Sequence, residues 1–232
     1  MSHFSTGSDY DVTFHKFAPR NFHWILEQRL IKNWLYSTHV DEPILDIATG
    51  TGRVSGYLAY GLGFKNVIGI DNSESMLKVA RDKYPLVRFE NLDIRSQKIL
   101  NQEYKVITAF RLVGKADMHL LEDVFNFINL NTKKDSLLIL NNHNNSQSMT
   151  ARARRILNRQ ILDTRHDNEI IERLSKINFR IVESFSLGIT PQTGDKYYLG
   201  KKLSELIEGM NYKYFAKFHK LGVNNIILCI KL

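Results

Sequence analysis

The sequence contains little of what marks a secreted or membrane-spanning protein. A single cysteine, Cys229, occurs among 232 residues, so no internal disulfide can form. Its apolar neighbours in residues 226–230 favour a small buried core residue over a nucleophile. No apolar run approaches the roughly 18 residues that cross a bilayer, and the first residues lack the pattern of a signal peptide. We therefore expect a soluble, cytoplasmic protein with no membrane partner.

Patterns that bind a metal are missing as well. The eight histidines include no His-x-x-x-His pair, and the single cysteine offers no second thiolate. Repeats and low-complexity linkers are also absent from the sequence. Because 43% of the residues are hydrophobic and 24% are charged, the chain can bury a full core. We expect one domain with additions, and no metal site.

Positive charge dominates the composition. The chain has 32 Lys and Arg residues against 24 Asp and Glu residues, which gives a net charge of +8. This surplus suits an anionic partner: a nucleic acid, a phosphorylated metabolite or an acidic membrane surface. Residues 143–220 alone hold fourteen of the basic residues and eight of the acidic ones. Most of the surplus therefore lies in the second half of the chain.

Short apolar runs rich in β-branched residues alternate with stretches of helical period along most of the chain. This alternation predicts an α/β protein with a seven-stranded, mostly parallel sheet and helices on both faces. The expected strands are residues 43–48, 66–71, 86–91, 105–110, 136–141, 179–187 and 224–230.

Three segments are additional to this alternation. Residues 1–40 form an N-terminal lid helix, and residues 41–232 form the main domain. Insertions at about 143–165 and 189–222 follow two of the expected strands. Ligands of open α/β sheets bind outside the carboxyl ends of parallel strands. We therefore expect both insertions to form a helical lid over that edge.

A turn of small residues follows the first expected strand. The sequence Ile-Leu-Asp-Ile-Ala-Thr-Gly-Thr-Gly lets the backbone approach a ligand closely, and the helix behind it offers free N–H groups. Asp71 ends the next strand, nineteen residues after Gly52, where a carboxylate can accept hydrogen bonds from both hydroxyls of a ribose. The glycine spacing differs by one residue from the nicotinamide-binding Gly-x-Gly-x-x-Gly pattern. The turn therefore predicts a nucleoside site of another kind.

Two further acids, one inside the first strand and one after the third, complete a pattern of three motifs. With them the sequence resembles the class I S-adenosylmethionine-dependent methyltransferases over residues 43 to about 188. Ala48 stands where the family more often has glycine. The segment 107–113 lacks the Asp/Asn-Pro-Pro signature of enzymes that methylate amino groups of nucleic acids. The residues that match the motifs are Asp46, Ala48, Gly50, Gly52, Asp71, Asp93 and Ile94.

The resemblance implies a Rossmann-like fold, S-adenosylmethionine as the cofactor, and roles for particular residues. Asp46 would orient the ammonium of the methionine part, and Asp71 would hold the ribose. Asn72 and Met76 would border the ribose or adenine, whereas Asp93 and Ile94 would contact the adenine. The remaining cofactor contacts would be Ala48, Gly50, Gly52, Phe110 and Arg111.

Methyl transfer to a hydroxyl or ammonium requires that the acceptor lose a proton, and histidine is the usual agent. His143 follows the fifth strand and His119 begins the helix after the fourth, so both are candidate bases, with His143 the first choice. Each is equally compatible with an ordinary solvated or hydrogen-bonded histidine. Tyr10 and Asn142 are the candidate contacts to the acceptor.

The sequence favours a methyltransferase that acts on oxygen or nitrogen of a small, anionic or sugar-like acceptor. An RNA methyltransferase is the main alternative, because the segment 151–157 is rich in arginine. A non-catalytic regulator that binds the cofactor is a third hypothesis, and a nicotinamide oxidoreductase is the weakest. If the charge of residues 143–220 has a function, it attracts an acidic acceptor to the mouth of the site.

Overall fold

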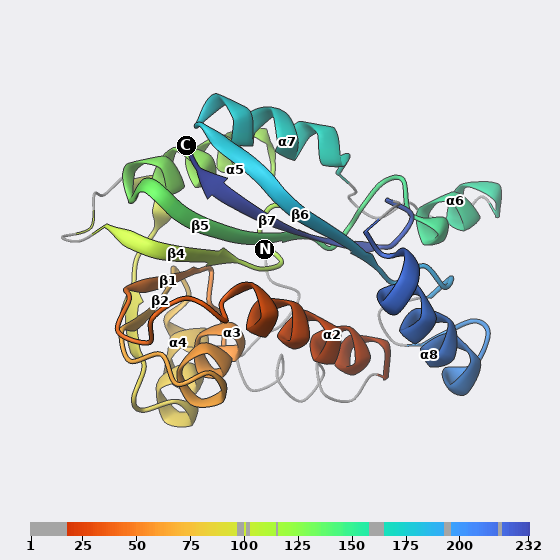
Figure 1. Ribbon diagram of the computed structural model, residues 1–232, viewed down its shortest axis with the longest axis horizontal. Coiled ribbons are helices and arrows are strands. Elements are labelled where there is room, and N and C mark those ends of the chain that lie inside the picture. The colour runs from red at the N-terminus through yellow and green to blue at the C-terminus, as the bar shows by residue number, and fades with distance from the viewer. Residues whose placement is uncertain are drawn as a thin grey trace.

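The computed structural model describes residues 18–96, 100, 103–114, 116–157, 165–192, 196–217 and 220–232. Seven strands form one sheet in the order β3-β2-β1-β4-β5-β7-β6 (Figure 1). Their bounds are β1 Ile44–Ile47, β2 Val67–Asp71, β3 Arg88–Asn91, β4 Tyr104–Ala109, β5 Thr132–Asn142, β6 Phe179–Leu187 and β7 Asn224–Lys231.

The sheet is mostly parallel, as the sequence predicted. Strands β1 to β5 pair in parallel, and only β7 runs against its two neighbours, β5 and β6. Strand β6 therefore points the same way as β1, so six carboxyl ends share one edge. Strand β5 begins at Thr132, four residues before the expected start, and its pairing with β4 shifts register between Tyr104 and Val106.

Helices cover both faces of the sheet, which confirms the predicted layers (Figure 1). Buried side chains of α2, α3 and α4 form one core cluster with the sheet, and those of α5 and α7 form a second. The α-helices are α2 Ala18–Trp34, α3 Arg53–Gly56, α4 Glu74–Lys83, α5 Met118–Leu130, α6 Met149–Ile156, α7 Asp167–Lys176 and α8 Lys201–Met210; the shorter turns are η1 Tyr57–Gly61, η2 Ile94–Ser96 and η3 Asn211–Phe215.

Helix α2 contributes directly to the core. Leu26, Leu30 and Ile31 are fully buried against one face of the sheet. The indole Nε1 of Trp34 donates to Glu183 on β6 at 2.7 Å. The part of the predicted lid that the structure describes is therefore an integral layer of the domain.

Helices α6 and α8 follow β5 and β6, and both lie at the end of the molecule where these strands finish (Figure 1). This position agrees with the expected placement of the two insertions at the carboxyl edge. Among the helices of the described residues, none combines the length and apolar character that a membrane span requires.

Candidate functional site

The turn after β1 contains two glycines that are needed for different reasons. Both have positive φ, 57° at Gly50 and 78° at Gly52. A Cβ on Gly52 would lie 2.9 Å from Cζ of Phe89 and 3.0 Å from Cδ2 of Tyr84, so close packing excludes a side chain there. A Cβ on Gly50 would meet nothing within 4 Å. Gly50 therefore presents bare backbone to open space, as a turn that cradles a ligand must.

Asp46 lies beneath this turn and holds it in shape. It is buried, and Oδ2 accepts hydrogen bonds from the hydroxyls of Thr49 at 2.6 Å and Ser55 at 2.7 Å. Oδ1 accepts from the Thr108 hydroxyl at 2.7 Å. Burial raises the pKa of Asp46, although these hydrogen bonds act in the opposite direction. Both oxygens are engaged within the protein, so the structure supports a positioning role for this carboxylate.

Asp71 ends β2 at the open side of the turn. Its Oδ2 accepts from the backbone N–H of Gly50 at 2.8 Å, and Oδ1 accepts from that of Ser73 at 2.9 Å. Burial raises the pKa of Asp71, and these backbone donors partly offset the rise. The carboxylate is thus fixed between the glycine turn and the start of α4, with part of its surface exposed.

A cavity of about 380 Å³ opens beside Asp71 at the carboxyl ends of β1 to β4. This volume lies in the range of small-molecule sites. The cavity brings together six predicted residues: Ala48, Asp71, Asn72, Asp93, Ile94 and His119. Three charged side chains that the sequence interpretation missed also line it: Arg95, Asp117 and Asp123.

Arg95 is the most informative of the missed residues. Its Nε lies 3.0 Å from both carboxylate oxygens of Asp93, and its backbone N–H donates to Oδ1 at 2.9 Å. These hydrogen bonds lower the pKa of Asp93. In the sequence, a basic residue two positions after the acid indicated this pairing. The short turn η2 folds the chain back there and brings the two side chains together.

The other predicted cofactor contacts do not line this cavity. Met76 and Phe110 are buried in the domain. Arg111 follows β4 with a φ of 59°, a left-handed conformation that is uncommon outside glycine. Its backbone N–H donates to Oδ1 of Asn141 at 2.6 Å, which holds the end of β4 to the end of β5. Backbone strain of this kind often occurs at functional sites.

The two candidate bases have different surroundings. His119 is exposed in the first turn of α5 and lines the cavity. His143 is half-buried, and its Nδ1 lies 3.1 Å from the point where a Cβ on Gly114 would stand. It therefore packs against the loop that follows β4 and does not line the cavity.

The two candidate acceptor contacts are not brought to the cavity either. Tyr10 lies outside the described residues. Asn142 is fully buried, and its Nδ2 donates to the carbonyl of Arg165 at 3.0 Å and to Oδ1 of Asp167 at 2.8 Å. This side chain joins β5 to the start of α7, and in this conformation it is closed to a ligand.

A buried polar network that the sequence interpretation missed connects the end of β5 to α2. Nδ2 of Asn141 donates to Oδ1 of Asn224 at 2.9 Å, and Nδ2 of Asn224 donates to Oε1 of Glu27 at 2.7 Å. Glu27 also pairs with Arg53 of α3 at 3.4 Å. The signal was a glutamate placed on the mostly apolar, buried face of a helix. The network fixes α2 against the carboxyl edge of the sheet.

Among the described residues, no group of three or more His, Cys, Asp or Glu side chains has the arrangement of a metal site.

Comparison with known proteins is consistent with this geometry. Residues 44–129 match a family model described as a methyltransferase domain. Over 81 residues the chain is 32% identical to a protein of Invertebrate iridescent virus 6 that is named as a methyltransferase; the match covers 34% of this chain and 30% of the viral protein. The chain covers no more than 30% of the length of the curated relatives that it matches first.

Two crystal structures share the fold over nearly the whole chain. An S-adenosylmethionine-dependent methyltransferase from Thermotoga maritima is 16% identical with a TM-score of 0.65, and the match covers 97% of this chain and 95% of that one. Magnesium protoporphyrin IX methyltransferase from Synechocystis PCC 6803, with S-adenosylhomocysteine bound, is 14% identical with a TM-score of 0.64, covering 93% and 86%. At these identities the likeness concerns the fold, and it confirms the predicted architecture.

Proposed function

We propose that this chain, in which residues 44–129 match a methyltransferase domain, is a class I S-adenosylmethionine-dependent enzyme that transfers a methyl group to oxygen or nitrogen of a small acceptor. The observation that carries the proposal is the cavity lined by Ala48 and by the carboxylates of Asp71 and Asp93, beside the turn whose Gly50 N–H donates to Asp71. These residues fit the cofactor, because they lie at the ends of three neighbouring strands at the carboxyl edge of the sheet. The glycine turn would face the methionine part, Asp71 the ribose and Asp93 the adenine.

Each part of the cofactor has residues that suit it. Asp71 accepts hydrogen bonds from the ribose hydroxyls, while Asp93 and Ile94 bound the adenine. The turn at Ala48 and Gly50 lets the methionine part approach the backbone. When bound, S-adenosylmethionine supplies a methyl group already activated on a sulfonium, so the protein mainly has to align the acceptor with it and exclude water.

Removal of a proton from the acceptor requires a base close to the methyl group. We propose His119 for this role before His143, because His119 lines the cavity whereas His143 packs beside Gly114. The strained backbone at Arg111 would place the end of β4 next to the reacting atoms.

The acceptor is proposed to enter from the end of the molecule formed by the insertions 143–165 and 189–222. The surplus of basic residues in this part of the chain supports an anionic acceptor, or a neutral one with polar groups such as a sugar. Helix α2, which the Glu27–Asn224 hydrogen bond fixes against the carboxyl edge of the sheet, is proposed as the third side of this entrance.

Calorimetric titration tests the cofactor assignment. We expect S-adenosylmethionine and S-adenosylhomocysteine to bind with micromolar affinity, and Asp71→Ala to abolish most of this binding because the ribose hydroxyls lose their acceptor. Asp82→Ala, which removes an exposed acid on α4, is the matched control and should leave the affinity unchanged. Binding of NADH, with no heat from either methionine-derived ligand, would contradict the proposal.

Transfer of a labelled methyl group to a panel of hydroxylated, carboxylated and amine compounds tests the base. His119→Ala should lower the turnover number at least a hundredfold while the affinity for S-adenosylhomocysteine changes little, since a general base contributes about 10²–10⁴ to the rate. His143→Ala is the direct comparison, and His39→Ala, an exposed histidine remote from the cavity, is the control. Equal turnover in His119→Ala and the wild type would remove His119 from the mechanism.

A further inference from the structure

Helix α8 and the turn that follows it expose an apolar surface. Leu203, Leu206 and Met210 lie on one face of α8, and each has at least half of its surface exposed. Phe215 in η3, which follows α8 directly, is also 57% exposed. Exposed aliphatic side chains are normal singly, but a contiguous set indicates an interaction site.

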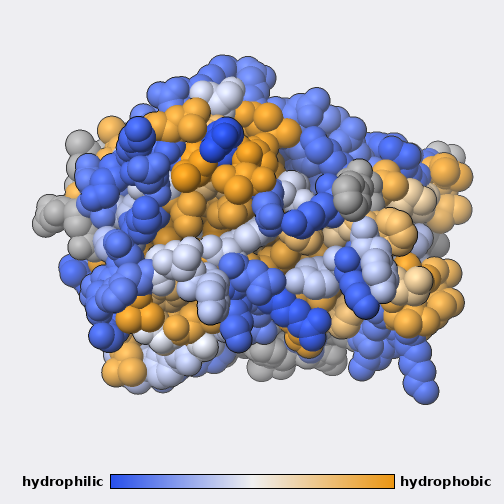
Figure 2. Space-filling model, viewed as in Figure 1, coloured by the Kyte–Doolittle hydropathy of each residue, from blue (hydrophilic) through white to orange (hydrophobic). Residues whose placement is uncertain are grey.

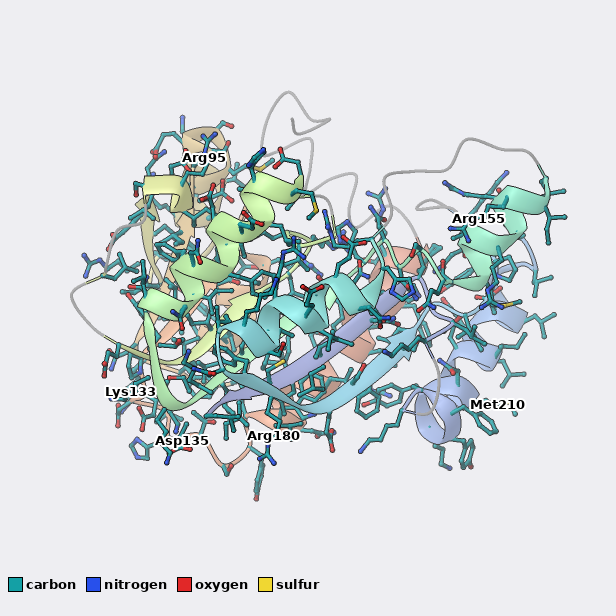
Figure 3. The ribbon with its side chains drawn as sticks, turned by 90° about the horizontal axis from the view of Figure 1, so that it is seen from above. Arg95, Lys133, Asp135, Arg155, Arg180 and Met210 are labelled. Carbon is teal, nitrogen blue, oxygen red and sulfur yellow. The ribbon has the colours of Figure 1, made fainter. Side chains whose placement is uncertain are left out.

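Helix α6 exposes further apolar side chains at the same end of the molecule. Ile156 and Leu157 at its end are 82% and 62% exposed. Hydrogen bonds tie α6 to the segment that precedes α8, since the backbone N–H of Gln192 donates to the Thr150 hydroxyl at 3.4 Å. Figures 1 and 3 place α6 and α8 at the same end of the molecule, and Figure 3 shows Arg155 and Met210 there. In Figure 2, hydrophobic and hydrophilic residues lie side by side over that end.

We use the name docking surface for the exposed apolar residues that gather at this end of the molecule: Ile156, Leu157, Leu203, Leu206, Met210 and Phe215.

Basic residues outnumber acidic ones in the segments that carry the docking surface. The parts of the two insertions that the structure describes contain ten Lys and Arg residues but only two acids, Glu205 and Glu208. Glu208 is buried, where it accepts hydrogen bonds from the backbone of Gly188 and Thr190 and takes no part in the surface. The ammonium of Lys213 lies 4.9 Å from the centre of the Tyr214 ring, so a cation and an aromatic side chain stand together at its edge.

This combination of apolar and basic groups distinguishes between partners. A soluble anion or an RNA would use the positive charge but would leave the leucines in water. A second copy of the chain would bury the leucines but would bring like charges together. An anionic bilayer accepts both, because aliphatic side chains enter the acyl boundary while Lys and Arg remain among the headgroups.

We propose that the docking surface binds peripherally to membranes that contain anionic lipid. The sequence led us to expect no membrane partner because it has no spanning segment, but a peripheral surface needs none. The surface lies at the carboxyl edge of the sheet, next to the entrance proposed for the acceptor. Membrane binding does not depend on the proposed methyl transfer, because it uses only these exposed residues.

Co-sedimentation of the full chain with lipid vesicles tests this inference. We expect binding to vesicles of phosphatidylcholine mixed with phosphatidylserine, little binding to phosphatidylcholine alone, and weaker binding as salt rises. The double variant Leu206→Asp/Met210→Asp should lose binding at every salt concentration. The double variant Lys201→Gln/Lys202→Gln should weaken it about fivefold for each lysine removed, since each basic residue near such a surface contributes about 1 kcal/mol.

Matched controls distinguish binding through the docking surface from non-specific binding to vesicles. Leu86→Asp replaces a leucine that is 80% exposed before β3, at the opposite edge of the sheet. Lys134→Gln removes an exposed lysine near the start of β5. Both should bind vesicles as the wild type does. All of these positions are exposed, so every variant should keep the thermal midpoint and the affinity for S-adenosylhomocysteine of the wild type.

Several results would overturn the proposal. Failure of the wild type to bind mixed vesicles, or equal binding to neutral ones, would do so directly. A dimer in solution that Leu206→Asp/Met210→Asp dissociates would assign the surface to a second copy. Binding of RNA that the lysine variants weaken and the aspartate variants do not, without binding to vesicles, would assign it to nucleic acid. If the wild type does not bind S-adenosylmethionine or S-adenosylhomocysteine, that result would contradict the proposed function but not this inference.

Discussion

At the scale of single residues, the glycine turn shows that one motif meets two separate requirements. Gly52 packs against Phe89 and Tyr84, whereas Gly50 faces open space. Ala48 in the same turn adopts a φ of 55°, so the turn accommodates one side-chain methyl group in the left-handed region. Substitution by alanine therefore separates the packing requirement from the ligand requirement.

Gly52→Ala should destabilise the protein by about 2–4 kcal/mol, because steric overlap adds to the strain of a positive φ. Gly50→Ala should cost only about 1–2 kcal/mol of stability. It should weaken the binding of S-adenosylhomocysteine at least tenfold, because the alanine methyl group occupies the open space over the turn. Urea unfolding and calorimetry measure the two effects. Gly209→Ala, in α8 with nothing within 4 Å, is the control and should not destabilise. Wild-type stability in Gly52→Ala would refute the packing argument.

At the scale of elements, short polar side chains hold the strand ends and helix starts together. Asp167 at the start of α7 is buried, and its carboxylate accepts from Nδ2 of both Asn142 and Asn225. Nε of Arg165, directly before α7, donates to the carbonyl of Val113 at 3.0 Å. Asn142, which the sequence suggested for acceptor contact, is thus part of a joint between β5 and α7.

Asn142→Ala should lower the free energy of unfolding by about 1–3 kcal/mol, because the buried Asp167 loses one of its donors. The affinity for S-adenosylhomocysteine should not change, since Asn142 does not line the cavity. Chemical denaturation and calorimetry check both statements. Asn144→Ala, at a half-exposed position whose backbone carbonyl accepts from Arg165, should shift stability by less than about 0.5 kcal/mol. Unchanged stability with loss of methyl transfer would instead favour the acceptor contact predicted from the sequence.

At the scale of the whole molecule, a buried histidine links stability to pH. His23 on α2 is 7% exposed, and its Nε2 lies 3.4 Å from Nε2 of Gln192. Burial lowers the pKa of His23 from 6.5; the nearby carboxylates of Glu208 and Glu27 oppose this shift, and Arg111 adds to it. The folded protein therefore holds this imidazole neutral at pH values where the unfolded chain protonates it.

The sign of the pH effect follows from this lowered pKa. Stability contributed by neutral His23 is present above the unfolded value of 6.5 and is lost as the pH falls below it, because only the unfolded state then takes up the proton. Urea midpoints measured from about pH 7.5 to about pH 5.5 should fall by more in the wild type than in His23→Gln. His39→Gln, at an exposed position, should follow the wild type. Parallel curves for the wild type and His23→Gln would contradict the prediction.

Much of the fold and half of the candidate site were predictable because they depend on local pattern. β-Branched runs located all seven strands, and the small-residue turn with its following acids located Ala48, Asp71, Asn72, Asp93 and Ile94 at one cavity. The methyltransferase match over residues 44–129 agrees with this half of the molecule. Parallel strands place their carboxyl ends together, so order along the sequence is enough to bring such residues to one edge.

The sequence by itself determined which segments form strands, where the glycine turn lies, and that Cys229 is buried. Cys229 is fully enclosed in β7. Only the tertiary structure decided which polar side chains face a ligand. The Asn142 side chain donates to Asp167, and Asp46 accepts hydrogen bonds from residues of the turn above it. Arg95 and Asp117, by contrast, line the cavity. A polar residue after a strand has the same pattern in either case. Its direction depends on which donors and acceptors other elements bring within about 3 Å, and those partners are distant in the sequence.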